Sequence, residues 1–203
     1  MAENAEISQD LKKIQIFNAA RRTFSKFGFA KTTLDDIAEA VGMKKASLYY
    51  YYSCKEEIFR DVVKSETDEF ILALEPKVFQ VHSVKDQLKT FVKTRTEYFQ
   101  KMMTLHNITV QAALEFLPLV EQIYKEFFER QFKIINTVFS QGIQNGQLRN
   151  FDSERVANVF LTAIESFGLL AIHKSKFGHE IDYQKIQDDA AYLSELIIDG
   201  LKK

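Results

Sequence analysis

The side chains best suited to chemistry in this chain lie just after Gly42, where two lysines are followed by four consecutive tyrosines. One face of a short helix at this position would carry Lys45, Ala46, Tyr49 and Tyr50, with little acid. Lysine donates hydrogen bonds to phosphates and guanine edges, and the apolar atoms of alanine and tyrosine suit thymine methyl groups. The residue types and their spacing therefore indicate a helix that binds DNA.

A second short helix must position that face. Thr33 is predicted to cap it, and Asp36 three residues later would complete a capping box. One buried face then follows at helical spacing: Leu34, Ile37, Ala38 and Val41. Gly42 ends the helix, because a residue without a Cβ tolerates a left-handed backbone. The stretch from Thr32 to Lys55 is thus predicted to form a helix-turn-helix whose second helix buries Leu48 and Tyr52.

The distribution of charge supports a DNA partner although the total does not. The chain of 203 residues has a net charge of −1. Residues 12–55 contain nine Lys or Arg against three Asp or Glu, a local charge of +6, so the remainder carries −7. Attraction to phosphate acts over roughly a Debye length, so the local charge decides.

The segment from Val41 to Tyr52, followed by Lys55-Glu56-Glu57, resembles the signature of the TetR family of bacterial transcriptional regulators. The resemblance covers about the first quarter of the chain. It implies base contacts from Lys45, Ala46, Tyr49 and Tyr50, and backbone contacts from Thr33, Ser47, Tyr51 and Lys55. Lys44 stands where the family often has serine, which removes a helix cap and adds a cation, so we include Lys44 among the DNA-binding candidates.

Composition predicts an all-α fold, because only 7 Gly and 2 Pro occur and 46% of the residues are apolar. We expect a three-helix DNA-binding domain (residues 1–55) and a six-helix domain for ligand binding and dimerisation (residues 56–203). The expected helices cover residues 11–27, 34–41 and 45–52, then 56–74, 84–103, 107–116, 119–145, 156–176 and 183–201, with residues 1–10 outside them. A single cysteine and the absence of a signal-like or membrane-spanning run predict a cytoplasmic protein without a membrane partner.

Aromatic residues are frequent in the second half of the chain, and two interpretations of them stay open. As a group they suit a pocket for an apolar or aromatic ligand, and the family resemblance implies a small-molecule inducer. The alternative is an ordinary aromatic core. The candidate ligand-binding residues are Phe91, Tyr98, Met102, His106, Gln111, Phe116, Tyr124 and Phe128.

The run from Val156 to Ile172 is apolar nearly all round, so it must be covered on more than one side. With the last helix it is predicted to pair with its symmetry mate in a homodimer. Glu165 interrupts this run. We expect it to pair with a cation or polar group, and a ligand-orienting role is the alternative.

Other chemistry is scarce. The four histidines lack metal-ligand spacing, and no nucleophile elbow, phosphate-binding loop or Cys-His signature occurs, so we predict no catalytic residues, metal or cofactor. The sequence therefore favours a ligand-responsive homodimeric repressor that a small apolar or aromatic inducer releases from a palindromic operator. A transcriptional activator remains possible, as does a carrier or enzyme whose helix-turn-helix is only structural.

Overall fold

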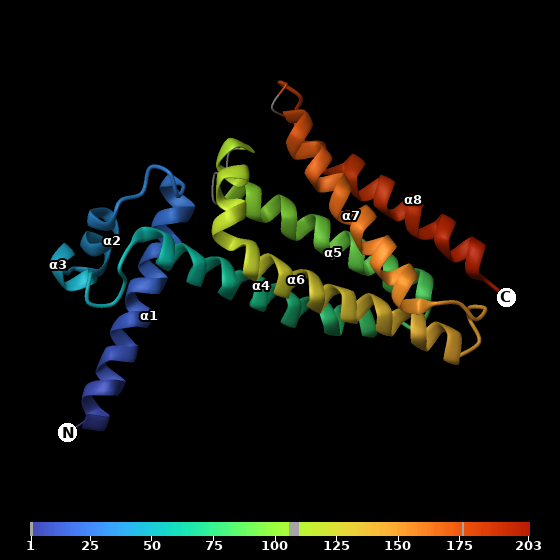
Figure 1. Cartoon of the computed structure of the whole chain (residues 1–203), viewed down its shortest axis with the longest axis horizontal. Helices are drawn as coiled ribbons and strands as arrows, with labels where there is room; N and C mark the ends of the chain where they lie inside the picture. Colours follow the sequence, from blue (N-terminus) through green and yellow to red (C-terminus); the bar gives the residue numbers. More distant parts are fainter. Residues whose placement is uncertain (1, 106–109, 176) are drawn as a thin grey trace. The chain divides into compact units, whose positions relative to one another are not determined.

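The computed structural model describes residues 2–105, 110–175 and 177–203, and the side chains of residues 11–103, 118–175 and 177–203. This part of the chain is all-α, as predicted, and an isolated antiparallel bridge joins Leu148 to Lys202. Its eight helices are α1 (Ala2–Phe27), α2 (Leu34–Val41), α3 (Lys45–Leu48), α4 (Lys55–Phe79), α5 (Val84–Leu105), α6 (Val110–Gln144), α7 (Ser153–Ser175) and α8 (Tyr183–Leu201) (Figure 1).

Several predicted helix boundaries are wrong. Helix α1 begins at Ala2 rather than Leu11, since Ala, Glu and Gln are good helix formers and acids suit a helix N-terminus. Helices α4 and α6 continue through Pro76 and Pro118, so five helices follow α3 in the described chain instead of six. Each proline lacks the N–H that would bond the carbonyl four residues earlier in the helix. Both prolines are exposed, so water can bond that carbonyl instead.

The chain divides into two compact units, each with a hydrophobic core of its own. The N-terminal unit comprises Met1–Glu66 and Met102–Ile123, and the C-terminal unit comprises Thr67–Lys101 and Tyr124–Lys203. The division into domains at residues 55 and 56 stays a prediction.

The core of the N-terminal unit joins α1, α2, α3 and the start of α4. Phe24 of α1 meets Phe59 of α4 edge-on, with ring centroids 5.6 Å apart. Ile16 is fully buried, whereas Ile14 is 55% exposed and Phe27 is exposed as well. The buried stripe of α1 is therefore Ile16, Ala19, Ala20, Thr23 and Phe24, and it holds the helix against α2.

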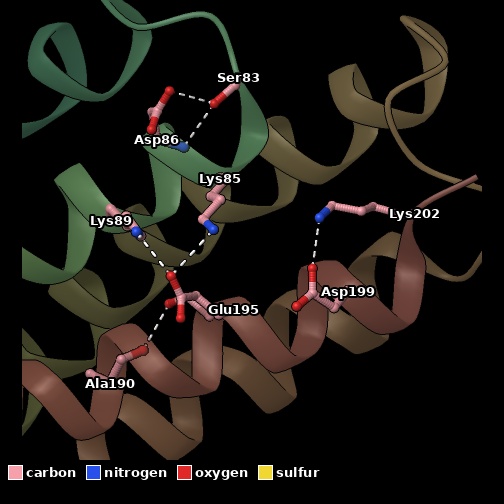
Figure 2. A network of polar contacts seen from close by, with 9 residues as sticks. Ser83, Lys85, Asp86, Lys89, Ala190, Glu195, Asp199 and Lys202 are labelled. Carbon is pink, nitrogen blue, oxygen red and sulfur yellow. Dashed lines mark hydrogen bonds and ion pairs between the residues drawn. The ribbon is translucent and has the colours of Figure 1, made fainter.

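The core of the C-terminal unit receives side chains from α4, α5, α6, α7 and α8. On its surface, Lys85 and Lys89 of α5 both pair with Glu195 of α8, at 3.3 and 3.0 Å (Figure 2). Ser83 Oγ accepts the backbone N–H of Asp86 at 3.0 Å and so caps the start of α5. Exposed pairs of this kind stabilise little, so apolar packing holds the unit together.

Helices α7 and α8 lie side by side in antiparallel directions (Figure 1). Asp152 and Asp182 cap them by accepting the N–H groups of Arg155 and Lys185. Among the helices that the structure describes, α7 alone is long and apolar enough to cross a membrane, judged by length and composition only. Five of its side chains are buried within the unit, as in a core helix: Ala157, Phe160, Leu161, Ile164 and Ile172.

Candidate nucleic-acid interface

The turn between α2 and α3 has the predicted geometry. Thr33 Oγ1 accepts the N–H of Asp36 at 3.2 Å, and Asp36 Oδ2 accepts the N–H of Thr33 at 2.7 Å, which completes the capping box. Gly42 follows α2 with φ 71°, a left-handed conformation that strains any residue with a Cβ. The N–H groups of Gly42 and Met43 then bond carbonyls of the last turn of α2. These bonds fix the direction in which the chain enters α3.

Helix α3 is shorter than the sequence predicts, because its α-helical part ends at Leu48 and the next three residues form turns. Aromatic residues are weak helix formers, and the N–H of Tyr51 bonds the Leu48 carbonyl three residues back, which tightens the backbone. Leu48 and Tyr52 are buried as predicted. The Tyr52 hydroxyl donates to Asp61 Oδ2 at 2.9 Å. Burial is the larger reason that the pKa of the Tyr52 phenol is raised, and the hydrogen bond to Asp61 is the next.

The residues that precede and follow Leu48 form one exposed surface. Tyr50 is 71% exposed and Tyr49 is 51% exposed, although both are large aromatic residues. Tyr51 is half-buried and meets the Tyr50 ring edge-on at 5.2 Å. Six of the nine predicted DNA contacts are exposed within this short segment: Lys44, Lys45, Ala46, Ser47, Tyr49 and Tyr50.

Lys45 forms an ion pair on this surface. Its Nζ lies 2.7 Å from Asp35 Oδ2 in the first turn of α2, and both side chains are exposed. The hydrogen bond and charge of Asp35 raise the pKa of the Lys45 ammonium above its ordinary value. Lys44 is the N-cap of α3 and makes no side-chain capping bond, as expected from the missing serine. The two adjacent lysines therefore differ in their local electrostatics.

Two other predicted DNA contacts use their donors in hydrogen bonds within the N-terminal unit. The Thr33 hydroxyl donates to Asp36 Oδ2 at 2.7 Å, inside the capping box. The Lys55 ammonium donates to the carbonyls of Phe29 and Thr32 at 2.9 and 2.8 Å, and it lies 4.2 Å from the centroid of the Phe29 ring. Lys55 thus ties the first residue of α4 to the loop before α2, and two of its three N–H groups are used within the unit.

Four of the eight candidate ligand residues have described side chains within the C-terminal unit: Phe91, Tyr98, Tyr124 and Phe128. His106 lies outside the described residues, and so do the side chains of Gln111 and Phe116. Met102 belongs to the N-terminal unit, whereas Phe91, Tyr98, Tyr124 and Phe128 belong to the other. Phe91 is completely buried in the core. The Tyr98 ring stacks on Phe70 with centroids 4.1 Å apart, and Phe128 packs partly buried against the same core.

A buried polar cluster lies within the C-terminal unit. Arg95 Nε donates to Gln131 Oε1 at 2.9 Å, and the Arg95 guanidinium pairs with Glu165. The Tyr124 hydroxyl donates to the other carboxylate oxygen of Glu165. Burial is the larger reason that the pKa of Tyr124 is raised, and the negative charge of Glu165 is the next. The expectation that Glu165 pairs with a cation or polar group is confirmed, and it has one partner of each kind.

Two cavities open on the C-terminal unit. One, of about 260 Å³, has walls from the α4–α5 connection and the end of α6, including Gln87 and Gln147. The other is an apolar groove of about 370 Å³ along α7 and α8, with Val159 and Leu196 in its walls. Among the side chains that the structure describes, no group of three His, Cys, Asp or Glu residues could hold a metal ion.

Residues 16–62 match the family model described as bacterial regulatory proteins, tetR family. The match covers the capping box, the turn at Gly42, α3 and the buried residues Leu48 and Tyr52. The chain belongs to the TetR family by this N-terminal segment. It is therefore a TetR-family transcriptional regulator, with a helix-turn-helix at its N-terminus and a helical C-terminal part.

Similarity to individual TetR-family proteins extends over different lengths. The biofilm operon negative transcriptional regulator IcaR of Staphylococcus epidermidis is 49% identical over 59 residues, which are 29% of this chain and 32% of that protein. The fatty acid metabolism regulator protein of Bacillus subtilis is 23% identical over 172 residues, 82% of this chain and 87% of its own. The higher identity is thus found over the shorter of the two matches.

Solved structures show the same fold over nearly the whole chain. A transcriptional regulator from Cytophaga hutchinsonii aligns with a TM-score of 0.78 at 23% identity, over 93% of this chain and 97% of that one. FadR from Bacillus subtilis, solved in complex with stearoyl-CoA, aligns with a TM-score of 0.64 at 20% identity, over 89% and 96% of the two chains.

Sequence reasoning missed the partners of the two lysines in this TetR-family domain. Asp35 and Phe29 lie 10 and 26 positions from Lys45 and Lys55, so no local pattern connects them. One signal was present: Asp35 and Asp36 are adjacent, and a capping box at Thr33 needs only the second of them. The extra acid at the start of α2 indicates a partner elsewhere.

Replacing Lys55 by methionine should lower the free energy of unfolding by about 1–3 kcal/mol, because it removes the donor for two backbone carbonyls in a partly buried loop. Urea denaturation measures the loss. Lys31→Met removes the same charge from an exposed position in that loop and should cost little. Unchanged stability, together with a log affinity for DNA that varies less steeply with log salt by about one unit, would instead make Lys55 a phosphate contact.

Proposed function

We propose that this TetR-family regulator is a homodimeric repressor that a small apolar or aromatic inducer releases from a palindromic DNA operator. The observation that carries the proposal is the exposed surface of α3 and the residues next to it (44–50), where two lysines, two small residues and two tyrosines occur together. Large exposed aromatic residues are expected at binding sites, and the local charge of +6 in residues 12–55 suits a polyanion.

Within this proposal the residues of the surface have two roles. Base edges are read by Lys45, Ala46, Tyr49 and Tyr50, while phosphates are bound by Lys44, Ser47 and Tyr51. Thr33 and Lys55 act mainly by holding α2 and α4 in place, since their donors already have partners. Residues 1–55 form the DNA-binding domain and residues 56–203 the domain for ligand and dimer.

The dimer forms through α7 and α8. These helices expose apolar side chains that solvent disfavours: Val159, Leu169, Leu170, Tyr192 and Leu196. The groove between Val159 and Leu196 is almost wholly apolar. A second copy related by a twofold axis would cover it with the same residues. Two α3 surfaces would then meet successive major grooves, about 34–36 Å apart, so the operator should be roughly palindromic.

An inducer is proposed for the C-terminal unit, against Tyr98, Tyr124 and Phe128. Aromatic rings suit an apolar guest, and the nearby Arg95–Glu165 pair would orient a polar end. Phe91 is buried deeply enough that it would meet a ligand only through a rearranged core. FadR, which shares the fold, binds stearoyl-CoA, and IcaR is a negative regulator. The first supports an apolar effector and the second supports repression. We further propose that the regulator acts in the cytoplasm.

The test combines DNA binding with thermal stability. The purified protein should bind labelled double-stranded DNA with a log affinity that falls linearly with log salt. A long-chain acyl-CoA should raise the melting temperature, since a ligand that binds only the folded state stabilises it, and should release operator DNA. Free coenzyme A, which lacks the apolar chain, should do neither. If no member of a broad panel of apolar and aromatic compounds stabilises the protein, the aromatic cluster is a filled core.

A further inference from the structure

Asp35 is an acid on the proposed DNA-binding surface that the capping box of α2 does not use, although its place in the first turn suits the helix dipole. The capping box uses Thr33 and Asp36 alone. The Asp35 carboxylate is instead exposed and bonds the Lys45 ammonium at 2.7 Å. A carboxylate facing phosphates opposes binding, so its place beside the first lysine of α3 requires a reason.

We propose that Asp35 is a specificity-determining residue, which holds Lys45 for the operator's base edges and weakens its attraction to the phosphates of unrelated DNA. This inference rests on the DNA-binding function proposed above. In this role Asp35 does not touch DNA itself and influences DNA binding only by holding the Lys45 side chain.

The electrostatics of the pair supply the mechanism. Binding to unrelated DNA depends almost wholly on cations that neutralise phosphates. Lys45 and Asp35 together carry no net charge, so Lys45 contributes little to this term while the pair is intact. The ammonium still has two N–H groups beyond the one given to Asp35. At the operator these can bond the acceptors of a guanine edge, which unrelated sequences do not present at the same place.

Lys44 provides an internal contrast. It is exposed one position earlier, at the N-cap of α3, and makes no capping bond with its side chain. Lys44 is therefore suited to a phosphate, whereas Lys45 is anchored from its other side by α2. Lys44 would thus attract the phosphates of any DNA, while the adjacent Lys45 would contact the base edges of the operator.

The experiment compares Asp35→Asn with Glu39→Gln, which removes the same charge from another exposed position of α2. Two affinities of the full-length protein are measured over a range of salt concentrations. One is for the operator sequence that the wild-type protein selects from random DNA, and the other is for unrelated DNA. Asp35→Asn should raise affinity for unrelated DNA by about three- to fivefold and steepen its salt slope by about 0.9. Affinity for the operator should rise less, so the specificity ratio falls. Glu39→Gln should change both affinities by similar, smaller factors.

A Lys45→Met background tests whether the effect passes through Lys45. There Asp35→Asn should change neither the specificity ratio nor the salt slope beyond the Glu39→Gln control. Melting curves establish that each variant is folded. Equal effects of Asp35→Asn and Glu39→Gln, or an effect that survives in the Lys45→Met background, would overturn the role of Asp35. A wild-type protein that bound no DNA would overturn the proposed function instead, which is a separate outcome.

Discussion

Leu196→Arg should convert the protein from a dimer to a monomer and remove operator binding with it. Leu196 is 52% exposed on α8 and lines the apolar groove beside Val159 of α7. A guanidinium at the centre of a twofold interface would face its own copy and be buried without a partner. Losing one of two linked recognition helices should lower operator affinity by about 100-fold or more. Sedimentation velocity and DNA titration measure the two effects.

Leu72→Arg is the matched control for this substitution. Leu72 is also an exposed leucine of the C-terminal unit, on α4, with 71% exposure, and it lies outside the groove. This variant should remain dimeric and bind the operator normally. The proposed interface would be wrong if wild-type protein sedimented as a monomer at micromolar concentration, or if Leu196→Arg remained a dimer.

Ala46→Glu should abolish operator binding without unfolding the protein. Ala46 is exposed on α3, so a longer side chain meets no packed core there, and glutamate is a good helix former. The added carboxylate would stand next to Lys45 on the surface that we propose faces phosphates and bases. Like charges brought together at an interface cost several kcal/mol, so affinity should fall by at least about 100-fold. The melting temperature should stay close to that of the wild type.

Ala40→Glu supplies the control for charge alone. Ala40 is exposed near the end of α2 and receives the same carboxylate within the same helix-turn-helix. It should weaken binding several-fold at most and should lose that effect as salt screens the charge. Equal losses for the two variants would mean that net charge, and not the surface of α3, governs binding.

The parts of the interface that the sequence predicts correctly are those that local rules determine. Thr33 and Asp36 form a capping box at fixed spacing, and Gly42 takes the left-handed conformation that its lack of a Cβ permits. Leu48 and Tyr52 lie one helical turn apart and are buried together. Each of these features depends on residues within about four positions of one another, where the backbone geometry is known in advance.

The features that the sequence does not predict depend on tertiary partners or on solvent. No local pattern predicts that the Phe29 ring and two carbonyls lie around the Lys55 ammonium. Pro118 reads as a helix end, yet an exposed proline leaves its freed carbonyl to water and α6 continues. Phe91 suits a pocket wall and a filled core equally well by type, and only packing from other helices makes it fully buried.

Selection of bound sequences from random double-stranded DNA by the purified full-length protein tests the central claim most directly. We predict enrichment of one roughly palindromic motif whose half-sites are centred about one helical turn, or a small multiple of it, apart. The enriched motif should be lost when Ala46→Glu protein is used. Recovery of no enriched motif by folded wild-type protein, at salt concentrations that permit unrelated DNA to bind, would contradict the account.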